Sequence, residues 1–322
     1  MRVLITGITG FVGSHMAEHA LAHGATVFGA SRWRSRTDNI EHLRSRITLL
    51  ESDLRDVSSV QALLEQSRPD YVVHLAAQSF VGSSWQTPAE TLTTNILSQV
   101  NLFEAVRAAK LAPRILCVGS SEEYGLVYED ELPIRETNPL RPLSPYAVSK
   151  VTQDVMGFQY WKSYGLPIVR TRAFAHEGPR RGDVFVTSNI AKQVAEIEAG
   201  VRPPVVRIGD VKPRRDFSDV RDIVRGYWLL LERGDAGEVY NLCSGRSWSI
   251  QQVLDFLVGA STVKGIAVEV DPARLRPSDV MVLEGDPAKI EKATGWKVEI
   301  PFERTLTELL DYWRERVRPA AR

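Results

Sequence analysis

Residues 119–125 read GSSEEYG and place two hydroxyls beside two carboxylates, directly after the apolar run RILCV. A short apolar run of this kind predicts a buried strand, so the four polar side chains follow a strand end. A carboxyl group in such a place can give or take a proton from a substrate. Glu123 should face away from Glu122 if the stretch is extended, because alternate residues then point to opposite sides.

A second pair of residues that could take part in acid–base chemistry is Tyr146 and Lys150, in the segment SPYAVSK. Residues four apart share one face of a helix, so the lysine ammonium should lie beside the phenol. A nearby cation lowers the pKa of a tyrosine from about 10 toward neutrality, which makes the phenol a usable acid or base. This spacing is common by chance, and it gains weight only from the other motifs of the chain.

A glycine loop supplies that context. Gly7, Gly10 and Gly13 follow the first apolar run and open a helical pattern. Glycines at such a junction let the backbone turn tightly and approach a pyrophosphate, which the helix N-terminus then binds. The sequence therefore predicts a dinucleotide site at the first strand.

The end of the next apolar run indicates which dinucleotide binds. It carries Arg32, Arg34 and Arg36 and has no carboxylate near Ser31. Guanidinium groups suit a ribose 2′-phosphate, so NADP is favoured over NAD, although at least one of the three should be a solvated loop residue. Asp53, after the third strand, is a candidate partner for the adenine amino group.

Composition excludes several classes of protein. The 322 residues include 43% apolar and 25% charged types, and forty basic residues balance forty acidic ones. The protein therefore has no overall electrostatic field that would favour binding to nucleic acid or to an anionic membrane. Cys117 and Cys243 lie in apolar stretches, which favours buried, reduced thiols over a disulfide or a metal site. With no signal-peptide pattern and no membrane-length apolar run, we expect a cytoplasmic protein.

Short Val/Ile/Leu runs alternate with amphipathic helical patterns through the first half of the chain. This alternation predicts an α/β fold with a doubly wound parallel sheet and a smaller C-terminal α/β domain that binds substrate. We expect the dinucleotide domain to span 1–171, joined by about 216–245. The substrate domain should comprise 172–215 and 246–322.

The segments TGITGFVG, HLAAQS, GSSEEYG and SPYAVSK, in this order, resemble the extended short-chain dehydrogenases/reductases that act on nucleotide sugars. The resemblance covers essentially the whole chain. It implies that Ser120 polarises the sugar 4-oxygen, that Tyr146 exchanges its proton, and that Lys150 orients the cofactor ribose and tunes the tyrosine. It also implies cofactor contacts from Thr9, Phe11, Val12, Leu54, Leu75, Ala76, Ala77, Ser79 and His176.

Within that family, RWRSRTDNIEHL and HEGPRRGDVFVT resemble the GDP-mannose 4,6-dehydratases. By contrast, SSEEYG itself, RRDFSDVRDIV and VYNLCSG resemble the GDP-4-keto-6-deoxymannose reductases at least as well. A dehydratase needs a carboxyl group that removes the C5 proton and protonates O6, and Glu122 takes that position by resemblance. The alternative to this catalytic role is a structural one, in which the Glu122 carboxylate caps neighbouring backbone groups. We expect an NADP-dependent dehydratase that makes GDP-4-keto-6-deoxymannose.

The reductase is the main alternative activity. A C3/C5 epimerase fits less well, because the family's version uses a cysteine in the active loop and SSEEYG has none. A catalytically silent nucleotide-sugar binder has one supporting feature, Ala175. Both sister families usually have Phe-Asn-His where this chain reads Phe174-Ala175-His176, and the asparagine helps to hold the substrate.

The substrate diphosphate should meet arginines from three loops, since guanidinium groups suit bidentate phosphate contacts. The resemblance assigns the nucleotide to Arg215, Arg276, Asp279 and Lys192, with Arg180 on the HEGPRRG loop, and the hexose to Ser84 and Glu177 beside Ser120 and Glu122. It also implies a homodimer that pairs TLTTNILSQVNLFEAVRAA and VTQDVMGFQYWKSYG in a four-helix bundle, with a tetramer left open. Packing on the sheet is the alternative for these helices.

Overall fold

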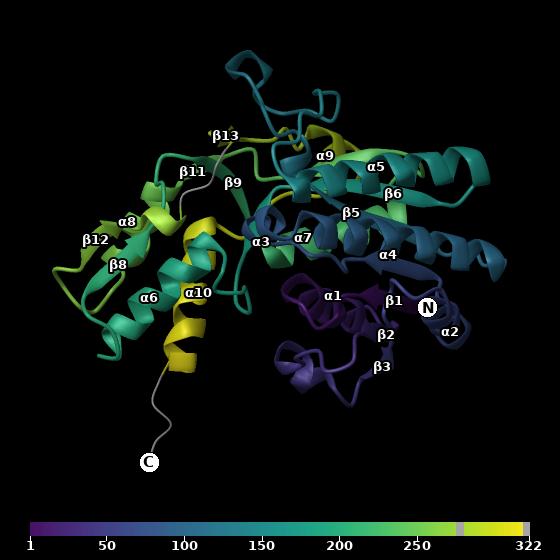
Figure 1. The fold of residues 1–322 in the computed structure, drawn as a ribbon, viewed down its shortest axis with the longest axis horizontal. Helices are drawn as coiled ribbons and strands as arrows, with labels where there is room; N and C mark the ends of the chain where they lie inside the picture. The colour runs from purple at the N-terminus through teal and green to yellow at the C-terminus, as the bar shows by residue number, and fades with distance from the viewer. Residues whose placement is uncertain (275–279, 318–322) are drawn as a thin grey trace.

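The structure, a computed structural model, describes residues 1–274 and 280–317. Its larger domain is built on a seven-stranded parallel sheet (Figure 1). In sheet order the strands are β10 (Val239–Leu242), β6 (Ile168–Ala173), β5 (Arg114–Ser120), β4 (Tyr71–His74), β1 (Arg2–Thr6), β2 (Thr26–Ser31) and β3 (Ile47–Glu51).

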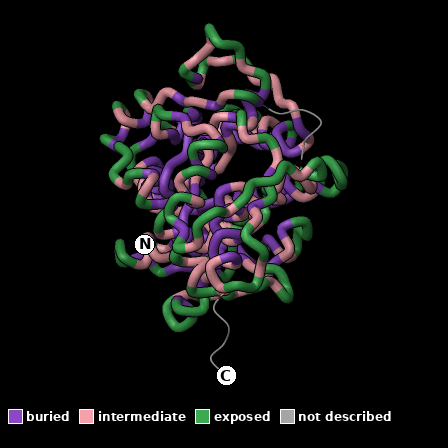
Figure 2. Tube along the Cα trace, turned by 90° about the vertical axis from the view of Figure 1, so that its left-hand side faces the viewer, coloured by how far each residue is buried: buried purple, intermediate pink, exposed green. Residues whose placement is uncertain are grey.

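Helices cover both faces of this sheet, which confirms the predicted doubly wound class. One apolar layer packs α1 (Phe11–Ala22), α7 (Val220–Arg233) and α9 (Ala288–Thr294) on one face. Another packs α2 (Val57–Ser67), α4 (Pro88–Ala108) and α5 (Pro145–Tyr164) on the other, with α3 (Val81–Gln86) beside α4 and α5. Figure 2 shows the resulting buried interior beneath an exposed rim.

Local sequence explains why α5 begins and ends where it does. Ser144 accepts a hydrogen bond from the N–H of Ala147, and Pro145 occupies the first turn, where a missing N–H costs nothing. The helix ends at Gly165, whose φ of +71° is the left-handed conformation that favours glycine. These signals place Tyr146 in the first turn, at the carboxyl edge of the sheet.

The smaller domain forms the left lobe of Figure 1. Its strands are β7 (Ala175–Glu177), β9 (Arg214–Asp219), β11 (Ser247–Ser249) and β13 (Val282–Leu283) in one sheet, and β8 (Val205–Ile208) with β12 (Ala267–Val270) in another. Helices α6 (Val186–Glu198), α8 (Ile250–Gly259) and α10 (Phe302–Val317) enclose its core. Short 3₁₀ turns are η1 (Asp38–Leu43), η2 (Ser121–Glu123), η3 (Glu129–Glu131) and η4 (Pro272–Arg274).

The chain passes between the domains more often than the expected boundaries allow. Strand β9 pairs in the smaller domain, although 216–219 had been assigned to the larger one. Helix α9 and Trp296 pack in the core of the larger domain, although 246–322 had been assigned to the smaller one. The sequence does not indicate where β9 and α9 belong, because both placements depend on long-range packing, which includes contacts with α7.

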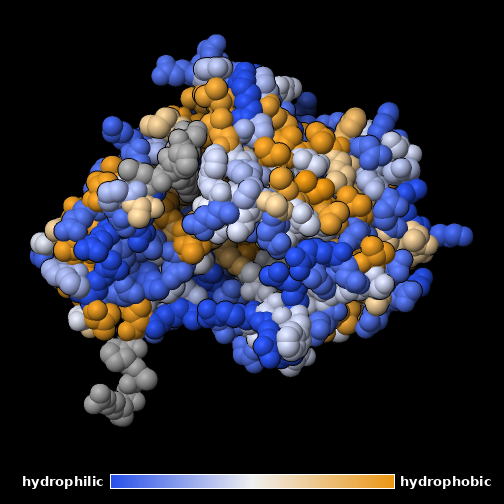
Figure 3. Space-filling view, in the orientation of Figure 1, coloured by the Kyte–Doolittle hydropathy of each residue, from blue (hydrophilic) through white to orange (hydrophobic). Residues whose placement is uncertain are grey.

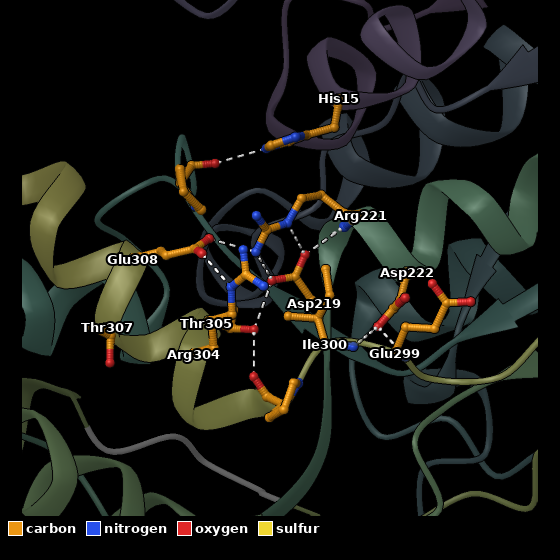
Figure 4. Close-up of polar contacts among 12 residues, drawn as sticks. His15, Asp219, Arg221, Asp222, Glu299, Ile300, Arg304, Thr305, Thr307 and Glu308 are labelled. Carbon is orange, nitrogen blue, oxygen red and sulfur yellow. Dashed lines mark hydrogen bonds and ion pairs between the residues drawn. The ribbon is translucent and has the colours of Figure 1, made fainter. Parts of the chain in front are cut away.

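Buried polar contacts join the two domains at the start of α7 (Figure 4). Asp219 is fully buried and accepts hydrogen bonds from Arg221 at 2.8 Å and from Thr305 of α10 at 2.8 Å. Arg221 also forms an ion pair with Glu308 of α10 at 2.6 Å. In a separate contact, the Nε2 of His15 on α1 lies 3.0 Å from the carbonyl oxygen of Pro179. Over the described residues, none of the helices is both long and apolar enough to cross a membrane.

Candidate active site

A cleft of about 1360 Å³ lies between the domains at the carboxyl ends of β1, β4 and β5. Ligands of doubly wound sheets bind at this edge. Figure 3 shows the hollow between the two lobes. The predicted residues that line it are Gly7, Thr9, Gly10, Phe11, Val12, Gly13, Arg32, Asp53, Leu54, Leu75, Ala76, Ala77, Ser79, Ser120, Glu122, Tyr146, Lys150, His176, Glu177, Arg180 and Arg215.

The glycine loop has the geometry that a dinucleotide pyrophosphate requires. Gly7 has a φ of +71°, which side-chain-bearing residues rarely adopt, and a Cβ on Gly13 would collide with the Gly7 carbonyl oxygen. Asn39 donates to the carbonyl of Thr9 at 3.1 Å and holds the loop from the η1 side. The loop therefore fits the cofactor that its spacing predicted.

A second hollow of about 510 Å³ adjoins the cleft, and it is lined by Arg32 and Arg34, the residues predicted to hold a 2′-phosphate. Arg36 instead pairs with Asp38 at 2.7 Å and is the solvated member of the three. Asp53 also lines this hollow, but its carboxylate accepts from Arg55 at 2.9 Å, which lowers its pKa. Its predicted bond to the adenine would therefore compete with Arg55.

Replacing Arg32 with alanine is expected to weaken NADPH binding about 10- to 100-fold, since a charge-assisted hydrogen bond contributes about 1.5–3 kcal/mol. NADH affinity should stay unchanged, because NADH lacks the 2′-phosphate. Fluorescence titration of both nucleotides measures this. Arg36→Ala is the matched control, and an equal loss for NADPH and NADH in the Arg32 variant would contradict the assignment.

The catalytic turn η2 begins at Ser120, the last residue of β5. The Ser120 hydroxyl oxygen accepts the N–H of Glu122 at 3.2 Å, and Glu123 Oε1 accepts the N–H of Ser120 at 2.8 Å. These two bonds form a capping box. The turn places Ser120 and Glu122 on the cleft, whereas Glu123 is fully buried.

Tyr146 and Lys150 share a face of α5 as predicted, with the ammonium 6.0 Å from the centre of the phenol ring. The predicted drop in tyrosine pKa is wrong for this structure, because burial raises the pKa of Tyr146 above its usual value. A hydrogen bond from Ser120 and the charge of Arg181 oppose that rise. Lys150 donates to the carbonyl of Val118 at 2.7 Å, and burial lowers its pKa to about 8.

His176 stacks on Phe11 at the first turn of α1, with ring centres 6.1 Å apart. Its Nδ1 contacts the carbonyl oxygen of Phe174 at 2.8 Å, and burial lowers its pKa to about 4, so the ring is neutral at physiological pH. The preceding Ala175 lines the cleft where the sister families place asparagine. His176 thus faces the cofactor side as predicted, without serving as a charged group.

Arg181, beside Arg180 on the HEGPRRG loop, is a further functional candidate. Its guanidinium carbon lies 3.4 Å from the Phe185 ring centre and 5.1 Å from the Phe11 ring centre. Its Nε lies 3.4 Å from Glu177 Oε2, beyond good hydrogen-bond geometry, and neither atom has a hydrogen-bond partner among the described residues. Burial raises the pKa of Glu177. A cation of this kind on the cleft wall can accept an anionic group.

Three predicted substrate residues are directed elsewhere. Arg180 lines the cleft, but its guanidinium binds Glu18 at 2.7 Å and His15, on helix α1. Lys192 pairs with Asp183 at 2.6 Å and lies outside the cleft lining. Ser84 is fully buried and donates to the carbonyl of Val81 at 2.7 Å, as helix hydroxyls often do.

The nucleotide end of the cleft contains two arginines. Arg215 lines it and donates to the carbonyl of Val280 at 2.6 Å. Arg276 and Asp279 lie outside the described residues. Arg274, which the sequence reasoning omitted, lines the cleft and donates to Asn189 at 2.7 Å. Two of the three arginine-rich loops thus reach the cleft within the described chain.

The chain is similar to known proteins in sequence and in fold. A GDP-mannose 4,6-dehydratase family model matches residues 4–309. A GDP-6-deoxy-D-mannose reductase of Pseudomonas aeruginosa is 35% identical over 98% of both chains. A GDP-mannose 4,6-dehydratase of Vibrio cholerae is 31% identical over 96% of this chain and 92% of its own.

The structure of RMD from Pseudomonas aeruginosa, complexed with NADPH, superposes with a TM-score of 0.85 at 32% identity. It covers 98% of this chain and 100% of its own. Its fold, together with the family match and the identity to both sister enzymes, agrees with the motifs that line the cleft. The chain belongs to the GDP-mannose 4,6-dehydratase family.

Proposed function

We propose that the protein is an NADP-dependent GDP-mannose 4,6-dehydratase. The observation that carries the proposal is the position of Glu122, a carboxyl group on the same cleft as Ser120 and Tyr146. A reductase has no C5 proton to remove and does not need this group. The family match, the Vibrio cholerae relative and the NADPH in the Pseudomonas aeruginosa structure support the substrate and the cofactor.

Each catalytic side chain has a role in this reaction. Ser120 donates a hydrogen bond to the hexose O4, and Tyr146 takes the O4 proton as C4 is oxidised. Glu122 removes the C5 proton, which the C4 ketone has made acidic, and delivers a proton to O6 so that water leaves. When bound, NADP would supply the hydride acceptor for C4 and the hydride donor for C6. The proton that Tyr146 took from O4 is then returned to C5, because the proton removed from C5 leaves in the water. No cofactor is consumed, and substrate equals product plus water.

Lys150 fixes the position of the Tyr146 phenol relative to the cofactor ribose. Arg32 and the glycine loop hold the dinucleotide. Arg215 and Arg274 are placed to hold the GDP diphosphate. We add Arg181 to this binding set, because its Nε has no hydrogen-bond acceptor among the described residues and an anionic ligand could supply one.

Incubation of the purified protein with GDP-mannose, with and without NADPH, tests the proposal. We expect a product that is lighter by one water in both reactions, with no net NADPH oxidation, as read by mass spectrometry and absorbance at 340 nm. Inert GDP-mannose together with stoichiometric NADPH oxidation by the 4-keto-6-deoxy sugar would show the reductase instead.

The reductase stays a second candidate because of the 35% identical Pseudomonas aeruginosa relative. Its reaction would use Ser120, Tyr146 and Lys150 and leave Glu122 without a proton to transfer. Ala175 removes an amide from the cleft relative to both sister families, so it does not favour either activity. The two reactions differ in NADPH consumption, which the same assay reads.

We also propose a cytoplasmic homodimer built on α4 and α5. Apolar side chains on this surface are half exposed, including Leu97 at 42%, Val155 at 52% and Phe158 at 44%. Figure 3 shows apolar surface in the region that these helices occupy in Figure 1. Exposed apolar groups clustered on two long helices suit a helix-bundle interface. The two free cysteines are buried, in keeping with a reducing compartment.

Val155→Glu should convert the dimer to a monomer, because a charge at the centre of an apolar interface is costly to bury. Light scattering coupled to size-exclusion chromatography measures the mass. Val268→Glu on β12 is the matched control, as Val268 is similarly exposed but lies in the smaller domain. A dimer that survives in the Val155 variant would rule out this surface.

A further inference from the structure

Glu123 belongs to the catalytic turn, yet the mechanism above does not use it. Its side chain is fully buried, and its Oε1 accepts the N–H of Ser120 at 2.8 Å. Ser120 in turn accepts the N–H of Glu122 at 3.2 Å. One buried carboxylate therefore fixes the backbone that carries both the polarising hydroxyl and the acid/base group.

The other oxygen of Glu123 faces a charged cluster on β6. Glu123 Oε2 lies 3.3 Å from Arg172 Nε and has no hydrogen-bond partner within the part of the chain that the structure describes. Arg172 donates to Asp154 Oδ2 at 2.6 Å, and Arg170 donates to Asp154 Oδ1 at 2.6 Å. All four side chains are at least nine-tenths buried. Burying ions is costly even when they are paired, so a cluster of this kind beneath a cleft needs a reason.

The position of Asp154 supplies that reason. Asp154 lies on α5 four residues after Lys150 and eight after Tyr146, so the three side chains share one helix face. Asp154 binds Arg172, Arg172 faces Glu123, and Glu123 binds Ser120. The cluster thus links the turn that carries Ser120 to the helix that carries Tyr146.

We propose that Glu123 is a positioning residue that holds the Ser120–Glu122 turn in register with the Tyr146–Lys150 helix. Misplacing reacting groups by about 1 Å can cost a factor of 10² in rate. The inference rests on the proposed function for the identity of the reacting groups. The same register would matter for a reductase, because Ser120 and Tyr146 act together on O4 in either reaction.

The chain contains a natural comparison for Glu123. Turn η3 repeats the glutamate half of the η2 capping box: Glu131 accepts the N–H of Tyr128 at 3.0 Å and pairs with Arg141 at 2.7 Å, while Tyr128 makes no side-chain cap bond. Glu131 is partly exposed and does not line the cleft. The same local motif therefore occurs without the link to α5, which separates capping from positioning.

Glu123 also acts on the charge of Lys150. Burial lowers the pKa of Lys150 to about 8, and the Glu123 carboxylate opposes that fall. The other groups that face Lys150 are Cys117 on β5, His74 on β4, whose pKa burial lowers to about 3, and the phenol of Tyr146. Burial also raises the pKa of Glu123, and Arg172 opposes that rise, so the Glu123 charge is present on the alkaline side. Removing this charge should lower the Lys150 pKa further. The ammonium is then lost at lower pH, so activity should fall at lower pH on the alkaline side.

Glu123→Gln and Glu123→Ala test the inference, with Glu131→Gln as the matched control. Glutamine keeps an acceptor for Ser120, so it should retain kcat within several-fold at pH 7 but shift the alkaline limb of the kcat profile to lower pH. Alanine should lower kcat roughly 10- to 100-fold with KM nearly unchanged. The Glu131 variant should match the wild type in both readouts.

Wild-type activity is first measured in both directions, GDP-mannose dehydration and keto-sugar reduction, so that failure of the proposed function is seen before any variant is compared. Wild-type kcat in Glu123→Ala, or an equal loss in Glu131→Gln, would overturn the inference. If the alanine variant lacks a cooperative melting transition, the glutamine variant decides, and an unshifted alkaline limb then overturns it.

Discussion

Glu122→Gln is expected to abolish dehydration of GDP-mannose and to leave NADPH binding at the wild-type level. Glutamine has nearly the same shape but cannot take the C5 proton or deliver one to O6. Loss of general acid–base catalysis should lower kcat by on the order of 10² to 10⁴. Single-turnover mass spectrometry of the product measures the loss of water directly.

This variant also separates the two sister activities. Its fold should be intact, since the Glu122 N–H, which binds Ser120, is unaffected by the substitution. Hydrogen–deuterium exchange at C5, followed by NMR in D₂O, should disappear together with dehydration. Dehydration at the wild-type rate would remove the role assigned to Glu122 and leave it as a structural cap.

Tyr146→Phe should reduce turnover to a similar extent, again by on the order of 10² to 10⁴, because phenylalanine has no hydroxyl group to exchange the O4 proton. KM for GDP-mannose should change little, since the proposed nucleotide contacts, Arg215 and Arg274, are unchanged. A lone loss of affinity with kcat unchanged would contradict the catalytic role. Tyr240→Phe is the control, as Tyr240 is a buried phenol on β10 whose hydroxyl oxygen accepts the N–H of Asp235 and which does not line the cleft.

The sequence predicted the parts of the site that depend on local spacing. Gly7 and Gly13 follow a strand and open a helix, and Tyr146 and Lys150 lie one helical turn apart, so neither needs knowledge of distant contacts. The same spacing could not give the tyrosine pKa. It shows that a cation is near the phenol, but the burial of Tyr146, which dominates, comes from the packing of both domains.

Residues on irregular loops were predicted less well. Arg180 and Arg181 are adjacent, and the sequence favoured Arg180 for the substrate. Arg180 has a φ of +76°, a left-handed conformation that an arginine in the sequence does not predict. Its guanidinium group points toward Glu18 as a result. Arg181 is left stacked on Phe185. The direction of a loop side chain depends on backbone angles that residue types determine only weakly.

The cluster beneath the turn was also beyond sequence reasoning. Arg170 and Arg172 lie in strand β6, whose sequence is IVRTRA. Charged residues in a strand are ordinarily expected to be exposed, yet both arginines are buried. Their partner Asp154 lies on the preceding helix and carries no motif of its own. Only the packing of α5 on β6 brings these charges together.

The repeated passage of the chain between the domains has a consequence for folding. After β6 the chain enters the smaller domain, and it returns to the larger one for α7 and again for α9. Neither domain is a continuous segment, so neither can be cut out and refolded with a complete core. We therefore expect the whole chain to unfold in one cooperative step, and NADPH bound to the larger domain should protect the smaller one from proteolysis to the same degree.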